Sequence, residues 1–182
     1  MECADPRSQG KAATLEEVLQ ARDRRVALQH QALECYRLPL ISLSLVAPGE
    51  IKTSPAWLRV ADYAQQAITE CCQQMAWDFV WEQATDGVAG PEWMVAVCAP
   101  AKALKQQMIA LEEDHPLGRL WDIDIIDNNG QSISRKACGF PARSCLLCHH
   151  YAHECARGKR HSVPQLLDEI VRRIECYERE RE

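Results

Sequence analysis

Two aspartates, Asp122 and Asp124, stand two positions apart in an apolar run that follows Gly118 and Arg119. In an extended strand, side chains two positions apart emerge on one face, so both carboxylates would point the same way. Neighbouring carboxylates repel each other unless a cation lies between them, and hard oxygen ligands of this kind suit Mg²⁺ that holds a substrate phosphate. Because Asp-x-Asp is short and common, an ordinary strand with two solvated aspartates is the alternative.

Three cysteines and a histidine form a second group with the spacing C-x2-C-x6-C-x5-H, namely Cys145, Cys148, Cys155 and His161. Thiolate and imidazole ligands within one short segment suit tetrahedral zinc, and four protein ligands would leave no open position. We therefore expect a structural rather than a catalytic zinc site. Free thiols and loop histidines are the alternative, because the gaps depart from the commonest finger spacings.

Composition limits the classes of protein to consider. A chain of 182 residues can form one domain with a real core, and a net charge of -5 gives no basic signal for nucleic acid or an anionic membrane. The first residues lack the apolar core of a signal peptide, and no stretch is long enough to span a bilayer, so we expect a cytoplasmic protein. Ten cysteines in a reducing compartment favour metal binding over disulfides.

The apolar periodicity predicts the elements that position these groups. One helix is expected from the capping box at Thr14 to about residue 35, and others begin at Ser54 and Pro100. Strands are predicted from Leu40 to about residue 47, over 77–82, over 93–98 and through the acid pair, with a returning strand over 131–134 after the turn 127–130.

Between residues 40 and 126 the order strand, helix, strand, strand, helix, strand predicts an α+β fold with a ferredoxin-like βαββαβ sheet of the palm or nucleotidyltransferase kind. The N-terminal helix precedes this sheet, and the Cys/His segment and a C-terminal helix follow it. Helices would cover one face of an antiparallel sheet and leave the acids on the open face, with the last strand beside the first and Ser42 and Ser44 near the acids. The expected parts are a flexible N-terminal tail (1–13), an α+β catalytic domain (14–136), and a zinc-binding-like segment with a C-terminal helix (137–182) packed on the same domain.

Three motifs together carry a resemblance to a known family: HPLGRLWDID at 115–124, CLLC at 145–148 and CARGK at 155–159. They resemble the apo-citrate lyase phosphoribosyl-dephospho-CoA transferase family, also called holo-citrate lyase synthase or CitX. Further similar positions are Ala21-Arg22-Asp23 with Arg25 and Gln29, Val46 to Gly49 with Lys52, and Ala99 to Ala101. The resemblance covers nearly the whole chain after the tail.

The resemblance implies a substrate and a partner. Such an enzyme takes 2'-(5''-triphosphoribosyl)-3'-dephospho-CoA and transfers the phosphoribosyl-dephospho-CoA unit to a serine of the citrate lyase acyl carrier (gamma) subunit, releasing diphosphate. Phosphoryl transfer needs in-line attack and neutralised phosphate charge. We therefore expect Asp122 and Asp124 to hold one or two Mg²⁺ ions and Arg119 to contact phosphate through its planar donor fork, the alternative being a surface arginine.

Other side chains near these motifs have less specific signals. Asp127 is interpreted as a turn-stabilising residue of Asp-Asn-Asn-Gly, the alternative being a further carboxylate of the site. His115 is interpreted as a structural histidine, the alternative being a role in proton transfer. Most surface bases are merely solvated, and bases three apart on a helix can also form ion pairs. With that alternative open, the candidates for contact with the CoA-derived substrate are Arg22, Arg25, Lys105, Arg135 and Arg143.

Two other classes of function compete with a transferase. A non-catalytic, zinc-stabilised module could bind an acyl carrier protein, with Asp122 and Asp124 as solvated residues. A thiol redox protein could use Cys145 and Cys148, but such a pair normally stands at a strand-to-helix junction of a βαβ unit, which the pattern lacks. A covalent change in the mass of the carrier is expected for the transferase and not for the two other classes.

Overall fold

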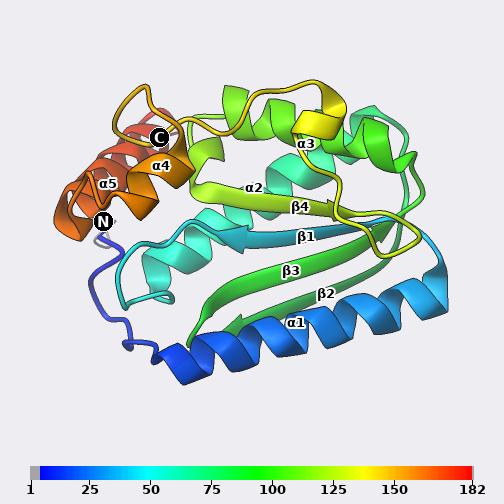
Figure 1. The fold of residues 1–182 in the computed structure, drawn as a ribbon, viewed down its shortest axis with the longest axis horizontal. Helices are drawn as coiled ribbons and strands as arrows, with labels where there is room; N and C mark the ends of the chain where they lie inside the picture. The colour runs from blue at the N-terminus through cyan, green and yellow to red at the C-terminus, as the bar shows by residue number, and fades with distance from the viewer. Residues whose placement is uncertain (1–4, 182) are drawn as a thin grey trace.

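An antiparallel sheet of four strands lies at the centre of the fold (Figure 1), in a computed structural model that describes residues 5–181. The elements in chain order are α1 (Leu15–Tyr36), β1 (Leu40–Leu45), α2 (Pro55–Gln74), β2 (Phe79–Gly87), β3 (Gly90–Val97), α3 (Ala101–Asp114), the 3-10 turn η1 (Gly118–Leu120), β4 (Trp121–Ile126), the 3-10 turn η2 (Lys136–Cys138), α4 (Ala152–Arg157) and α5 (Val163–Arg179). The α+β class predicted from the sequence is confirmed.

Capping residues begin the helices where the sequence indicates. Thr14 and Glu17 form the predicted capping box of α1, in which the Thr14 hydroxyl accepts a hydrogen bond from the Glu17 N–H and the Glu17 carboxylate accepts one from the Thr14 N–H. Ser54 caps α2 through a single bond, in which its hydroxyl accepts from the Trp57 N–H at 3.3 Å, and Pro55 stands in the first turn. These contacts satisfy N–H groups that the helix itself cannot pair.

The strands lie side by side in the order β2-β3-β1-β4. The last strand is therefore the neighbour of the first, as predicted. In the antiparallel register of β1 and β4, Ser42 lies opposite Asp124 and Ser44 lies opposite Asp122. The predicted proximity of the two serines to the acid pair is confirmed.

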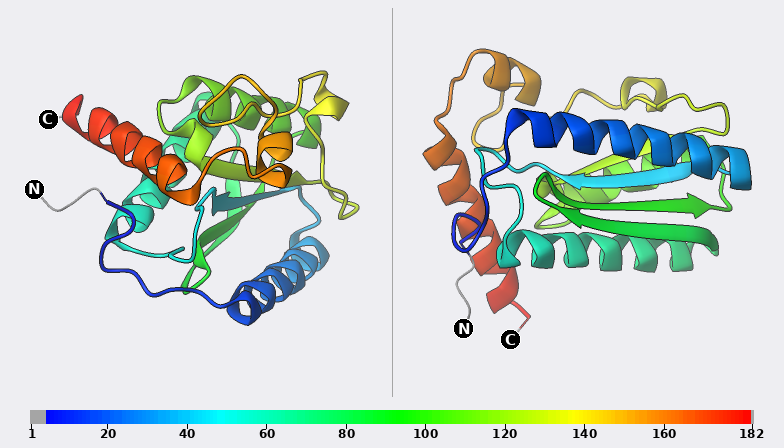
Figure 2. Two further views of the ribbon diagram at one scale, coloured as in Figure 1. Left: turned by 60° about the vertical axis from the view of Figure 1, so that its left-hand side comes forward. Right: turned by 90° about the horizontal axis from the view of Figure 1, so that it is seen from below.

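The two faces of the sheet are covered to different extents (Figure 2). On one face, α2 and α3 bury the apolar side chains of β4, including Trp121, Ile123 and Ile125. On the other face, α1 packs on a smaller cluster of Leu40, Met94, Ala96 and Ile126. The prediction of an open face is therefore wrong for the half of this face that α1 covers. Leu40 and Ile126 are paired at the end of β1 and β4 that lies away from Asp122, and they make this half apolar.

The turn after β4 follows the prediction, but the strand after it does not. One carboxylate oxygen of Asp127 accepts hydrogen bonds from the N–H groups of Asn129 and Gln131, at 2.9 and 2.8 Å. Gly130 takes the positive φ of 80° that the turn requires. The structural interpretation of Asp127 is confirmed. The expected strand over 131–134 is reduced to an isolated bridge between Ile126 and Ser132.

Both ends of the described chain contact the central body. Leu167, Ile170 and Ile174 of α5 are buried in the same core as the sheet. Arg7 donates a hydrogen bond to Asp168 of α5 at 2.9 Å, and Ala12 forms an isolated bridge with Ile51. The predicted tail includes residues 1–4, which lie outside the described residues. Within residues 5–181, no helix has both the length and the apolar character needed to cross a bilayer.

Candidate active site and metal centre

The acid pair lies on the sheet face beyond the part that α1 covers. Asp122 and Asp124 are both exposed, while the apolar residues that alternate with them are buried. Partial burial, together with the like charge of Asp122, raises the pKa of the Asp124 carboxyl. This direction is expected where two carboxylates share one small area of a sheet.

β4 is an edge strand of the sheet, so one side of its backbone has no strand partner. Two side chains of α3 form hydrogen bonds with the backbone on this side. Glu112 accepts a hydrogen bond from the Ile123 N–H at 3.0 Å, and the Lys105 ammonium donates one to the Ile123 carbonyl at 2.8 Å. Both side chains are buried. Ile123 stands between the two aspartates. The side chains of α3 therefore fix the backbone position of the acid pair.

Glu112 also gathers two of the predicted arginines. Arg143 donates to one oxygen of Glu112, and Arg135 donates to the other at 2.8 Å. Arg143 further donates to the Trp121 carbonyl at 2.9 Å, and its guanidinium lies 3.6 Å from the Asp122 carboxylate. A buried carboxylate needs such partners, because removing its charge from water without them is costly. Arg143 is therefore the arginine that reaches the acid pair.

Arg119 completes a group of three arginines at the beginning of β4. It donates a hydrogen bond to the Ser144 carbonyl. Burial and the positive charges of Arg143 and Arg135 lower the pKa of Arg119 to about 10. Arg119 consequently keeps its charge at neutral pH. It stands near Arg143 and Arg135, whose charges are balanced in part by Glu112.

The remaining predicted bases do not join this group of arginines. Lys105 is buried under β4 instead of standing at the surface that the sequence suggested. Arg25 forms an ion pair with Glu92 at 2.8 Å, and Arg22 is exposed on α1. The structure therefore brings Arg119, Arg135 and Arg143 together and leaves the two arginines of α1 apart from them.

Two carboxylates near this site were not singled out by the sequence analysis. Glu112 falls seven residues after Lys105, and this spacing of two helical turns is the signal that could have placed both side chains on one face of the helix. Glu92 precedes Trp93, which pairs with Leu43, so Glu92 lies on the same face of the sheet as Ser44. It was overlooked because the predicted strand began at residue 93, whereas β3 begins at Gly90.

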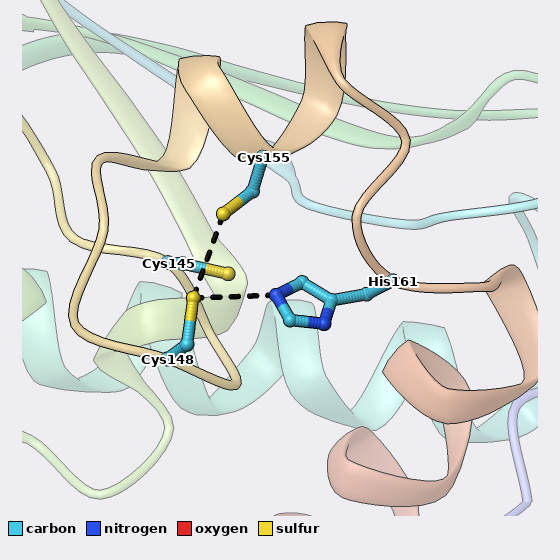
Figure 3. Close-up of side chains that lie close together, drawn as sticks. All are labelled: Cys145, Cys148, Cys155 and His161. Atoms are coloured by element: carbon cyan, nitrogen blue, oxygen red, sulfur yellow. Dashed lines mark hydrogen bonds between the residues drawn. The ribbon is translucent and has the colours of Figure 1, made fainter.

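The cysteines and the histidine of the second group converge on one point (Figure 3). The Cys148 sulfur lies 3.5 Å from the Cys155 sulfur and 3.3 Å from Nε2 of His161. The four potential ligand atoms, including that of Cys145, all lie within 4.8 Å of one another. Ligands at about 2.0–2.3 Å from one tetrahedral ion have separations of this order, so the group fits zinc.

Short backbone contacts hold this segment next to the arginines. The Cys145 N–H donates to the His150 carbonyl at 2.7 Å, and the Ala152 N–H donates to the Arg143 carbonyl at 2.9 Å. Burial raises the pKa of the Cys145 thiol. Hydrogen bonds from the N–H groups of Leu147 and Cys148, together with those of the Cys155 and Cys148 thiols, lower it by more, so the net shift of this pKa is downward. The segment that carries these ligands, residues 143–162, thus begins at Arg143 and is called the metal segment.

Paired carboxylates beside clustered arginines are suited to an enzyme that handles phosphate esters, and similarity to known proteins agrees with a transferase. The family described as apo-citrate lyase phosphoribosyl-dephospho-CoA transferase matches residues 13–177. The chain belongs to this family, and the resemblance inferred from its motifs is confirmed.

Individual relatives support the same assignment. A protein named apo-citrate lyase phosphoribosyl-dephospho-CoA transferase from Escherichia coli O139:H28 (strain E24377A / ETEC) is 41% identical over 159 residues, which is 87% of each chain. A protein of the same name from Shigella boydii serotype 18 is 40% identical over the same share of both chains. The chain is therefore related to transferases over most of its length.

Proposed function

We propose that this protein transfers the phosphoribosyl-dephospho-CoA unit from 2'-(5''-triphosphoribosyl)-3'-dephospho-CoA to a serine of the citrate lyase acyl carrier (gamma) subunit. The observation that carries the proposal is the acid pair on one face of β4, with Arg143 3.6 Å from Asp122, in a chain of this family. In the reaction, the serine oxygen bonds to the α-phosphorus while the bond to the diphosphate oxygen breaks and the serine proton leaves to a base.

Asp122 and Asp124 are the residues that would hold Mg²⁺. Their hard oxygen donors and their common face fit this ion, which would supply charge neutralisation on the triphosphate and the departing diphosphate. Arg119 and Arg143 would bind phosphate oxygens from the side of the metal segment, since a guanidinium offers a planar pair of donors. Arg22, Arg25 and Arg135 remain predicted substrate contacts, whereas the buried Lys105 would hold β4 through its bond to the Ile123 carbonyl.

The Cys/His group would hold a structural zinc ion. Cys145, Cys148, Cys155 and His161 offer four ligands to one tetrahedral ion, and binding would be coupled to the folding of this segment. We propose that zinc keeps the segment in the shape that positions Arg143 and the Ser144 carbonyl. The thiol redox alternative loses support, because Cys145 and Cys148 converge with two further ligands.

We also propose that the sheet is ferredoxin-like and that the C-terminal segment belongs to the same domain. The element order and the strand order β2-β3-β1-β4 support a ferredoxin-like sheet, and burial of α5 in the common core supports a C-terminal segment packed on the catalytic domain. The protein would work in the cytoplasm with its carrier partner, without nucleic acid or membrane. Every cysteine that the structure describes is a free thiol, which agrees with a reducing compartment.

The decisive experiment combines the protein, the apo-carrier, the triphosphoribosyl donor and Mg²⁺, and follows the mass of the carrier. Wild type should add one phosphoribosyl-dephospho-CoA unit to the carrier. Asp122→Asn and Asp124→Asn should each slow transfer by about a thousandfold or more, because charge stabilisation of several kcal/mol is lost. EDTA should stop the reaction and Mg²⁺ should restore it.

Asp127→Asn is the matched control for this experiment. The asparagine carbonyl can still accept the two turn hydrogen bonds of Asp127, so this variant should keep near-normal turnover. A carrier that binds without gaining mass would support the non-catalytic binding module. Near-normal transfer by well-folded Asp122→Asn would reject the role of the acid pair.

A further inference from the structure

A cavity of about 740 Å³ lies between the metal segment, α5 and the chain that leaves β1. In Figure 1 this region is where α4 and α5 flank the end of β1 and the beginning of β4. Much of its wall is apolar, with Val46, Leu146, Ala156, Val163, Leu166 and Ile170 contributing. Val163 is 42% exposed, although it is an aliphatic residue.

Basic residues line another part of the same cavity. Arg119, Arg143 and Lys159 contribute to its wall, and Arg143 is also the residue that lies 3.6 Å from Asp122. The cavity therefore combines an apolar wall with cations. This combination favours a ligand that carries both phosphates and an apolar body.

The cavity also adjoins the acid pair along β1. The Val46 N–H donates to the Leu120 carbonyl at 2.8 Å, so Val46 continues the pairing of β1 with the segment that leads into β4. By alternation, Val46 lies on the face of Ser44, which is the partner of Asp122 in the register. Groups that are covalently attached to a ligand in the cavity would therefore be within reach of Asp122.

We propose that this cavity binds the dephospho-CoA part of the donor substrate, with its diphosphate at the basic residues and its adenine and pantetheine arm against the apolar wall. The proposal rests on the transfer function proposed above, because the dephospho-CoA part is joined to the triphosphoribosyl group that must reach Asp122 and Asp124. The volume lies within the range of about 300–1,000 Å³ that small-molecule sites occupy. An acyl carrier is the competing occupant, but a recess that shares Arg143 with the acid pair fits a covalent neighbour of the reacting phosphate better.

The metal segment forms part of this wall, since Cys145, Cys155 and His161 also line the cavity. A zinc ion on these residues would therefore shape the binding site as well as stabilise the segment. Removal of zinc by a strong thiol-competing chelator should weaken binding of dephospho-CoA, and this effect can be measured without turnover.

The test uses free dephospho-CoA as the probe in isothermal titration calorimetry with the full chain. Val163→Asp places a negative charge on the cavity wall, and an aspartate in the first turn of α5 suits the helix N-terminus. Loss of apolar contact with the adenine and pantetheine arm, together with repulsion of the diphosphate, should weaken binding by about tenfold or more. Val80→Asp is the matched control, because Val80 is a similarly exposed valine (52%) on β2 and should leave binding unchanged.

A second variant and an inhibition pattern complete the test. Ala156→Trp should fill the cavity and also weaken binding. This variant tests the proposal if the Val163→Asp protein does not fold. Dephospho-CoA should inhibit transfer competitively with the donor and not with the carrier. Unchanged binding in both cavity variants, or competition with the carrier alone, would overturn the proposal.

The same measurement separates this proposal from the role of the acid pair. Asp122→Asn should bind dephospho-CoA like wild type while losing transfer. If Asp122→Asn instead keeps transfer and Val163→Asp loses binding, the acid-pair role fails and the cavity assignment stands. If Asp122→Asn loses transfer and Val163→Asp binds dephospho-CoA like wild type, the cavity assignment fails and the acid-pair role stands.

Discussion

The carboxylate of Glu112 accepts a hydrogen bond from the backbone N–H of Ile123 at 3.0 Å, and Ile123 separates Asp122 from Asp124. Glu112 is 2% exposed, and the same carboxylate binds Arg143 and Arg135. One buried side chain of α3 thus joins the strand that presents the acid pair to the arginines beside it. Because an edge strand has backbone groups without a strand partner, this contact also completes β4.

Replacing Glu112 with Gln should lower both stability and transfer. The amide can still accept from the Ile123 N–H, but two partly buried arginines lose their countercharge, at a cost of about 3–5 kcal/mol in the free energy of unfolding. Chemical denaturation measures this loss, and the kinetics should show a lower kcat. Glu113→Gln is the control, since Glu113 is exposed and binds Arg135 alone, and it should cost no more than about 1 kcal/mol. Equal stability of the two variants would contradict the central place of Glu112.

Lys105→Met should distinguish a structural lysine from a substrate contact. The variant keeps an apolar stem and removes the 2.8 Å hydrogen bond to the Ile123 carbonyl. The expected loss is about 1–3 kcal/mol of stability, because a buried carbonyl is left without its partner. A direct substrate contact would instead raise the KM for the donor and leave the denaturation midpoint unchanged.

Freshly purified, tag-free protein should contain about one zinc ion per chain by elemental analysis. A brief EDTA treatment that removes Mg²⁺ should leave zinc in place, because thiolates bind zinc more strongly than carboxylates bind Mg²⁺. Cys148→Ser should lower the zinc content and the Tm and should loosen residues 143–162 in hydrogen exchange. Cys98→Ser, at an exposed thiol outside the group, should change none of these.

Free side chains would give a different result for this segment. Substantially less than about one zinc ion per chain, with the cysteines and His161 all open to chemical modification in the folded protein, would reject the zinc site. The reagents can be applied before and after denaturation, so that slow reaction in the folded state is distinguished from an inert residue.

His115 should make stability depend on pH. Its ring lies 4.3 Å from Trp121 and 5.0 Å from Tyr177 between ring centres, and its Nδ1 accepts a hydrogen bond from the Leu117 N–H at 3.0 Å. Burial, with a smaller effect of the Arg181 charge, lowers the pKa of His115. Below about pH 6.5 the unfolded chain takes up a proton more readily than the folded protein, so stability should fall as the pH drops through the lowered pKa of the folded state.

Unfolding curves measured on both sides of this pH range check the His115 prediction. His115→Asn should be less stable at neutral pH, because aromatic packing is lost, and its stability should vary less with pH than that of wild type. His30→Asn, at an exposed histidine of α1, should retain the wild-type profile. A His115→Asn protein with the wild-type pH slope would assign the titration to another group.

The helix caps and the turn at Asp127 were predicted correctly because their hydrogen bonds join residues two to four positions apart. The alternation of exposed and buried residues around Asp122 was also predicted correctly, since successive side chains of a strand point to opposite faces. The neighbouring positions of β1 and β4 followed from the order of the elements. The expected strand over 131–134 was wrong because the turn alone does not supply a full ladder of partners.

The sequence by itself determined which residues could share a strand face and which four side chains could meet around one ion, because chain connectivity enforces both over short spans. Only the tertiary structure decided the partners of Lys105, Arg135 and Arg143, which join β4, Glu112 and Asp122 across many residues. Burial sets these partners, because a charge removed from water must find a counterion or a hydrogen bond where packing places it. That packing depends on how α3 lies along the outer edge of β4, which no local spacing encodes.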